Sequence, residues 1–218
     1  MRPIPHPDAD RFIEALVPHI PFDGWSRAAV RLAAEDTNLS MIEVDGLFPI
    51  GIPQMVEYYL DKRDRDLEEK LKETDLGEMR IRDRIAFAVR TRLEMAEDEV
   101  ETVRRTLSWF GLPFRSASAA KTLYRTVDTI WHVCGDRSTD FNFYTKRGLL
   151  AAVYSSTLLY WLDDASEGHA DTWAFLDRRI ADVMKIPKLT GRLKSAGAYL
   201  PNPGRFARAW RAARSSSA

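Results

Sequence analysis

The segment WHVCGDRSTDFNFYTKRGLL, residues 131–150, is the most informative stretch of this 218-residue chain. It crosses a glycine-aspartate break at 135–136 and then presents Ser138, Thr139 and Asp140 before an apolar run. A Ser or Thr cap with an acid in the first turn predicts the start of a helix. Three aromatic residues follow at once, more than burial of one turn requires. We expect some of them to face solvent, a ligand or a partner; the alternative is an aromatic-rich helix start packed wholly inside.

Apolar residues recur at helical spacing along almost the whole chain. Within residues 78–97, for example, Ile81, Ile85, Val89 and Leu93 fall four apart, the pattern of an amphipathic helix. The expected helices cover residues 8–17, 25–36, 41–48, 54–74, 78–97, 100–110, 116–133, 141–162 and 171–184. No segment reads as a strand pair. The sequence therefore predicts an all-α bundle of nine to ten helices.

The first 75 residues have the layout of a helix-turn-helix DNA-binding head, in which Ser40 caps a short third helix. That helix reads MIEVDGLF, with two acids and neither Lys nor Arg. A recognition helix needs cationic or amide side chains to reach phosphates and base edges, and carboxylates repel a polyanion. We therefore expect a degenerate head that does not bind DNA.

Composition and motifs exclude several classes of protein. With 45% hydrophobic and 29% charged residues the chain is typical of a soluble globular protein, and its formal net charge of zero argues against a nucleic-acid binder. The longest uncharged run, 148–162, is shorter than the roughly 20 residues that span a membrane. The single cysteine, Cys134, excludes an internal disulfide and is expected to be buried rather than reactive. No catalytic, metal or cofactor motif is present, so we expect a protein that is not an enzyme.

The same segment resembles the signature of a ubiquinone (coenzyme Q) biosynthesis accessory family, whose members bind lipid and have a TetR-like fold. The resemblance is carried by the Trp-His pair at 131–132, the Gly-Asp pair at 135–136, STDFN at 138–142 and TKR at 145–147. Two further stretches, ALVPHIPFDGWS at 15–26 and DTWAFLDRR at 171–179, are also similar, the first to bacterial members. The resemblance spans about residues 10–185. It implies a TetR-like bundle that assists the demethoxyubiquinone hydroxylase, and TetR-like bundles commonly form homodimers.

Two apolar-rich helices, 121–133 and 145–162, are the candidates for holding a lipid. Sites between bundle helices with such linings suit an isoprene tail or an acyl chain, although the same residues could simply fill a core. The resemblance favours a cavity for an isoprenoid quinone precursor or a phospholipid. The candidate lining residues are Leu123, Val127, Leu149, Leu150, Val153 and Leu158.

The resemblance also implies a docking surface for the hydroxylase. The residues that it places there are Ile130, Asp140, Phe143, Tyr144 and Arg147. Many family members carry Trp where this chain has Phe143, which keeps much of the apolar area and loses the indole N–H. We therefore expect the same docking site with somewhat weaker affinity.

The C-terminal tail is strongly basic: eight Lys and Arg residues follow the last acid, Asp182. Gly191 and Gly197 are expected to interrupt it. Apolar and aromatic residues opposite basic ones are typical of an interfacial helix on an anionic membrane surface. The alternatives are a frayed, solvated terminus or a helix folded back on the acidic body. The candidate membrane-binding residues are Leu193, Leu200, Arg205, Phe206, Arg208, Trp210 and Arg211.

These observations predict three parts: a degenerate head (1–75), a lipid-binding helical domain (76–187) and a basic amphipathic tail (188–218). The function they favour is that of a non-catalytic accessory protein, cytoplasmic and peripheral on the inner membrane, that presents a prenylated quinone intermediate or another lipid to the hydroxylase. The alternative is a TetR-like lipid-sensing transcription regulator, against which the acidic third helix counts. A lipid-modifying enzyme is a third interpretation, and the absence of a catalytic motif counts against it.

Overall fold

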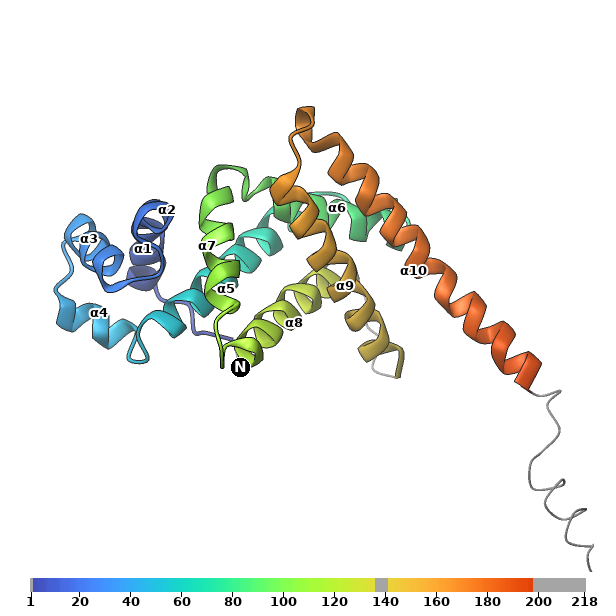
Figure 1. The fold of residues 1–218 in the computed structure, drawn as a ribbon, viewed down its shortest axis with the longest axis horizontal. Coiled ribbons are helices and arrows are strands. Elements are labelled where there is room, and N and C mark those ends of the chain that lie inside the picture. The colour runs from blue at the N-terminus through green and yellow to red at the C-terminus, as the bar shows by residue number, and fades with distance from the viewer. Residues whose placement is uncertain (1, 136–140, 198–218) are drawn as a thin grey trace, which may run out of the picture. The chain divides into compact units, whose positions relative to one another are not determined.

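The computed structural model describes residues 2–135 and 141–197, with only the backbone described for 141–143 and 186–197. Within these ranges the chain is helical apart from turns and loops, and no strand is present, which confirms the all-α prediction (Figure 1). Contacts divide the chain into two units, Met1–Asp177 and Arg178–Ala218. The three-part division at residues 75 and 187 stays a prediction.

The helices follow one another with short connections. Their bounds are α1 (Pro7–Leu16), α2 (Ile20–Asp23), α3 (Arg27–Thr37), α4 (Met41–Leu47), α5 (Ile52–Lys72), α6 (Ile81–Glu94), α7 (Val100–Phe110), α8 (Ser116–Val133), α9 (Phe141–Asp163) and α10 (Ala170–Gly197). The observed bounds of α7 and α8 match those expected from the sequence. The expected cap of α9 at Ser138 or Thr139 lies outside the described residues.

One expectation was wrong: α10 does not end near residue 184 but continues through Gly191 to Gly197. A single glycine inside a helix costs only about 1 kcal/mol relative to alanine, and the Leu, Lys and Arg residues around it are good helix formers. Gly191 is therefore a weak stop signal, whereas Pro187, which the same helix also contains, is a stronger one at about 3 kcal/mol.

The N-terminal helices pack around an aromatic core. The ring centroids of Phe12 and Phe48 lie 5.6 Å apart, as do those of Phe48 and Tyr58, so α1, the residue after α4, and α5 meet there. Ser40 and Glu43 form a reciprocal capping box at the start of α4. The exposed face of α4 carries Ile42, 84% exposed, with Glu43 and Asp45. No cation lies on this helix, as the sequence indicated.

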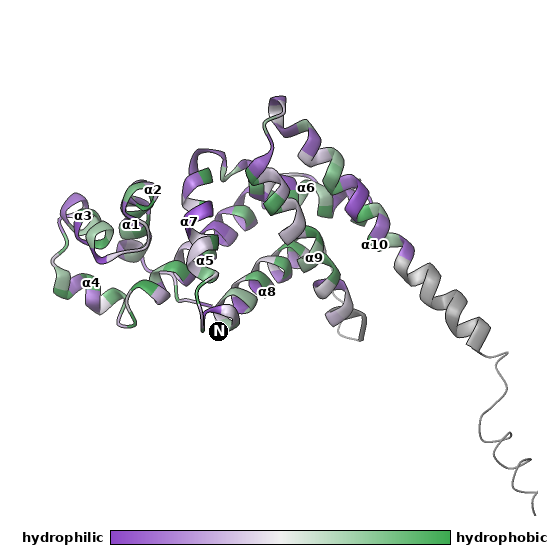
Figure 2. Cartoon of the chain, in the orientation of Figure 1, coloured by the Kyte–Doolittle hydropathy of each residue, from purple (hydrophilic) through white to green (hydrophobic). Residues whose placement is uncertain are grey.

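Helix α5 connects these N-terminal helices to the rest of the first unit. It packs on α1, α6 and α8, and α8 packs on α6, α7 and α9. Figure 1 shows α5 running from the N-terminal helices toward α6, with α8 alongside. Its second half is densely charged and hydrophilic (Figure 2). Three of these charged residues, Asp61, Arg63 and Asp64, are buried. The Arg63 guanidinium pairs with Glu14 of α1, with 2.7 Å between Nη1 and Oε1, and also with Glu99.

Candidate functional site

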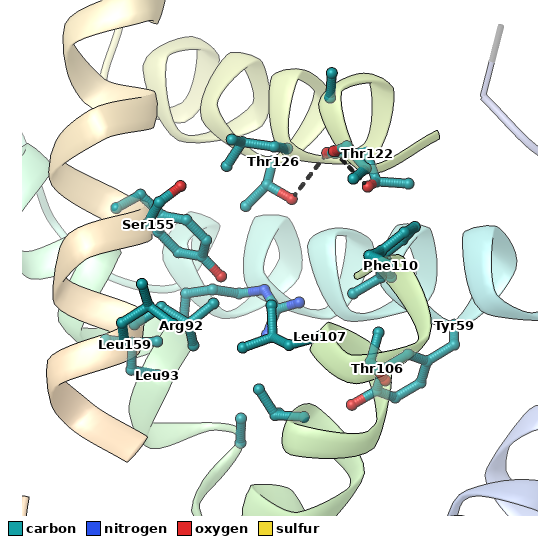
Figure 3. Close-up of a pocket in the computed structure, with 18 residues that line it drawn as sticks. Tyr59, Arg92, Leu93, Thr106, Leu107, Phe110, Thr122, Thr126, Ser155 and Leu159 are labelled. Carbon is teal, nitrogen blue, oxygen red and sulfur yellow. Dashed lines mark hydrogen bonds between the residues drawn. The ribbon is translucent and has the colours of Figure 1, made fainter. Parts of the chain in front are cut away.

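A pocket of about 300 Å³ lies between α5, α6, α7, α8 and α9 (Figure 3). Eleven of its 18 lining residues are apolar, and the other seven carry hydroxyl, phenol or guanidinium groups. The apolar wall includes Leu93, Val103, Leu107, Phe110, Leu123 and Leu158. All of these helices belong to the first unit.

Small side chains help to leave this volume open. Ala96 follows α6, and Ala119 and Ala120 lie in the first turn and a half of α8; all three line the pocket. Protein interiors are otherwise packed as densely as organic crystals, so larger side chains at these positions would occupy the space. Exposed Ala120 and Leu159, the latter 58% exposed, lie at the edge that reaches solvent.

One end of the pocket carries a buried ion pair. Arg92 of α6 is 5% exposed and Asp64 of α5 is 1% exposed. The Arg92 Nε donates to Asp64 Oδ1 over 3.3 Å, and the Thr126 hydroxyl of α8 donates to Asp64 Oδ2 over 2.9 Å. Figure 3 shows the side chains of Arg92 and Thr126 directed into the cluster of lining residues. Two helices therefore donate hydrogen bonds to a single carboxylate on α5.

Burial determines the electrostatics of this group. It raises the pKa of Asp64 to about 6, although Arg92 and the Thr126 hydroxyl favour the ionised carboxylate. Burial also works against the charge of Arg92, but Tyr154 and Asp64 outweigh it and raise the Arg92 pKa. The pair is thus a salt bridge near neutral pH and becomes a protonated acid beside a guanidinium in mild acid.

Only part of the predicted lipid-binding set lines this pocket. Leu123 and Leu158 do; Val127, Leu149, Leu150 and Val153 do not. The pocket reaches residues 119–126 of α8 and 154–159 of α9, and the other four lie farther along these helices. Val127, Leu150 and Val153 are buried there as core residues. The role of all six in lipid binding stays a prediction.

The walls contributed by α5, α6 and α7, and above all Arg92, were not expected from the sequence. Two signals could have found the polar end. On α6 the apolar stripe Ile85, Ala88, Val89 continues at Arg92, and on α5 Asp64 falls within the apolar stripe that starts at Leu60. A charge on the core-facing stripe of a helix is expected only where a partner or a ligand satisfies it.

The predicted docking residues have different environments. Tyr144 is 70% exposed, but Ile130 is 0% exposed and cannot lie on a surface, so its expected place there was wrong. It faces inward because α8 packs on both α5 and α9. Arg147 is also buried and its Nε donates to Asp128 over 2.6 Å. Asp140 and the side chain of Phe143 lie outside the described residues.

The predicted membrane-binding residues cannot be placed. Leu193 belongs to α10 by its backbone, and its side chain lies outside the described part of the chain. The other candidate membrane-binding residues lie entirely outside the described part of the chain: Leu200, Arg205, Phe206, Arg208, Trp210 and Arg211.

Neither metal binding nor thiol chemistry has a visible site in the described ranges. Cys134 is buried, and burial raises the pKa of its thiol to about 12, so the nucleophilic thiolate does not form near neutral pH. Among residues 2–135 and 141–197 no three His, Cys, Asp or Glu side chains cluster as metal ligands would. None of the helices described is long and apolar enough to cross a membrane.

This fold defines a class, the TetR-like helical proteins. The crystal structure of a TetR transcriptional regulator from Nitrosomonas europaea matches with a TM-score of 0.67 over 82% of this chain and 99% of that chain. The sequence identity is 17%, so the match shows the fold alone.

Sequence comparison gives the family. The COQ9 family model matches residues 116–187, which include α8 and α9. The chain is 34% identical over 196 residues to the human "Ubiquinone biosynthesis protein COQ9, mitochondrial", covering 87% of this chain and 62% of that protein. It is 34% identical over 180 residues to the Drosophila melanogaster protein of the same name, covering 81% and 55%. The chain therefore belongs to the COQ9 family, which confirms the resemblance seen in the sequence. It spans about three fifths of the length of these relatives.

The raised pKa of Asp64 predicts a specific pH dependence of stability. Its value of about 6 in the folded protein exceeds the ordinary 3.8, so protonation favours the folded state. This contribution is complete below about pH 4 and is lost as the pH rises through 6. The free energy of unfolding of the wild type, minus that of Asp64→Asn, should therefore fall between pH 4 and pH 7 by on the order of 1–3 kcal/mol. Urea titrations of both proteins across this range measure it; a difference that stays constant contradicts the assignment.

Proposed function

We propose that this chain is a non-catalytic accessory protein of ubiquinone biosynthesis. It binds a prenylated quinone intermediate or another lipid in the interhelical pocket, and presents it to a demethoxyubiquinone hydroxylase at the inner membrane surface. The observation that carries the proposal is the pocket itself, an apolar space between five helices with a single buried cation at one end. The names of the curated relatives support the pathway.

The size of the pocket suits one end of a long lipid. Its 300 Å³ lies at the lower limit of the roughly 300–1,000 Å³ typical of ligand sites. A head group and the first part of a tail would be enclosed, and the rest would leave past Ala120 and Leu159 at the exposed edge. A carrier that passes its cargo to a membrane enzyme needs this kind of partial enclosure, because a fully enclosed lipid would have no exit.

Filling the pocket should abolish lipid binding. Leu123 lines the pocket and Tyr124, the next residue of α8, does not and is exposed. We expect Leu123→Trp to lower the affinity for Nile red, an apolar fluorescent probe, by about tenfold or more, because the indole occupies the volume that the ligand needs. The matched variant Tyr124→Trp should bind as the wild type does. If the wild type and both variants bind Nile red equally, the probe binds outside this pocket, and the proposed site loses its support.

The start of α9 is proposed as the docking surface for the hydroxylase. Tyr144 is an exposed aromatic residue there, and exposed aromatics are common anchors of interfaces. Tyr144→Ala should weaken co-purification with the hydroxylase about tenfold, with little change in melting temperature. Ile42→Ala on α4 removes a comparably exposed apolar side chain from the N-terminal region and is the control. An unchanged affinity of the Tyr144 variant, or equal losses in both variants, would argue against this surface.

We also propose that the protein forms a homodimer, because TetR-like bundles commonly do.

The basic tail is proposed to hold the protein on anionic lipid. Each cation near an acidic membrane contributes about 1 kcal/mol, so several together should dominate the binding. Replacing the arginines at 205, 208, 211 and 214 with Gln should lower affinity for vesicles containing phosphatidylglycerol by more than tenfold, and deletion of residues 189–218 should abolish it. Co-sedimentation at low and high salt measures both effects. Vesicle binding that survives the deletion would show that another surface is responsible.

A further inference from the structure

Arg92 has hydrogen-bonding capacity that the protein does not use. Its Nε donates to Asp64, and within the described part of the chain neither terminal nitrogen donates a hydrogen bond to another residue. These two nitrogens carry four of the five N–H groups of a guanidinium. The side chain is 5% exposed and lines the pocket, and Figure 3 shows its nitrogen atoms among the lining side chains. The terminal nitrogens are not completely buried and border the pocket, where an oxygen atom would accept hydrogen bonds from a charged donor.

A second polar group is available at the same place. Tyr154 of α9 lines the pocket and is buried, and within the described ranges its hydroxyl has no hydrogen-bond partner. Arg92 lines the same pocket from α6. By contrast, the Tyr59 hydroxyl in the same wall already donates to Glu99 over 2.8 Å. Arg92 and Tyr154 therefore offer hydrogen bonds to one ligand head.

The charge balance restricts what that head can be. Asp64 already neutralises Arg92, and both side chains are removed from water. An anionic head such as a phosphate would add an uncompensated negative charge to an apolar pocket next to a buried carboxylate, and its desolvation would be costly. A carbonyl or hydroxyl oxygen accepts the same hydrogen bonds and adds no charge.

We infer that Arg92 recognises the head of the bound lipid and that its pairing with Asp64 makes the pocket select an uncharged, oxygen-bearing head over an anionic one. The inference rests on the proposed lipid binding and deepens it by naming the residue that sets specificity. Leu123 and Leu158 on the apolar wall then contact the tail. Of the two lipid classes expected from the sequence, ring carbonyl or phenol lipids fit this end and phospholipids do not.

Three probes that share a decyl tail test this selection: a decyl-substituted benzoquinone, decylbenzene and decyl phosphate. Displacement of Nile red from the full-length protein measures each affinity. We expect the quinone to bind at least about tenfold more tightly than either other probe, since hydrogen bonds to a charged donor contribute the difference. Decyl phosphate binding best, or all three binding equally, would overturn the inference while leaving lipid binding intact. No displacement by any probe would overturn both.

The matched variants assign the effect to Arg92. In the double variant Arg92→Met with Asp64→Leu, apolar side chains replace the whole pair, which commonly leaves stability unchanged or raises it. It should bind the quinone and decylbenzene alike. Arg90→Met, on the same helix but outside the pocket, should keep the wild-type preference. If circular dichroism shows that the double variant is unfolded, Tyr154→Phe and Arg92→Lys replace it, and each must lower the quinone preference by several-fold without changing decylbenzene affinity. A preserved preference in these variants would contradict the role of Arg92.

Discussion

The buried ion pair between Asp64 and Arg92 is the constraint that sets how α5, α6 and α8 meet around the pocket. Asp64 accepts hydrogen bonds from α6 and α8 while it is itself part of α5, so one carboxylate joins three of the five helices that enclose the pocket. Removing one partner of such a pair leaves an uncompensated buried charge and commonly costs about 3–5 kcal/mol. The same pair leaves two guanidinium nitrogens directed at the pocket. Stability and recognition are therefore coupled at one place.

Helix α5 extends this arrangement to the N-terminal helices. Arg63, one residue before Asp64, pairs with Glu14 of α1 and with Glu99 before α7, and Arg65 pairs with Asp10 of α1 over 2.6 Å. These pairs fix the N-terminal helices to the pocket region through polar contacts whose geometry is specific. A TetR-like layout is thus retained although α4 carries no cation for a phosphate.

The fold was largely predictable because helical periodicity and caps are local properties of the sequence. Apolar spacing located α7 and α8 to the residue, and Ser40 marked the start of α4. The site was only half predictable. Residue type indicated the apolar helices α8 and α9, but the position of the pocket along them depends on which side chains are small and on how α7 packs across α8, neither of which is local. The burial of Ile130 was not predictable from the local sequence either, because it follows from the packing of α8 on α5 and α9.

The central claim is that the pocket holds a lipid with an uncharged oxygen head. Organic extraction of the full-length protein, purified from cells that make ubiquinone, followed by mass spectrometry, tests this most directly. We expect close to one ring-carbonyl or phenol lipid with an isoprenoid tail per chain, and little of it in a variant whose pocket is filled at Leu123. Extracts that contain no lipid, or contain phospholipid in the same amount from both proteins, would contradict it.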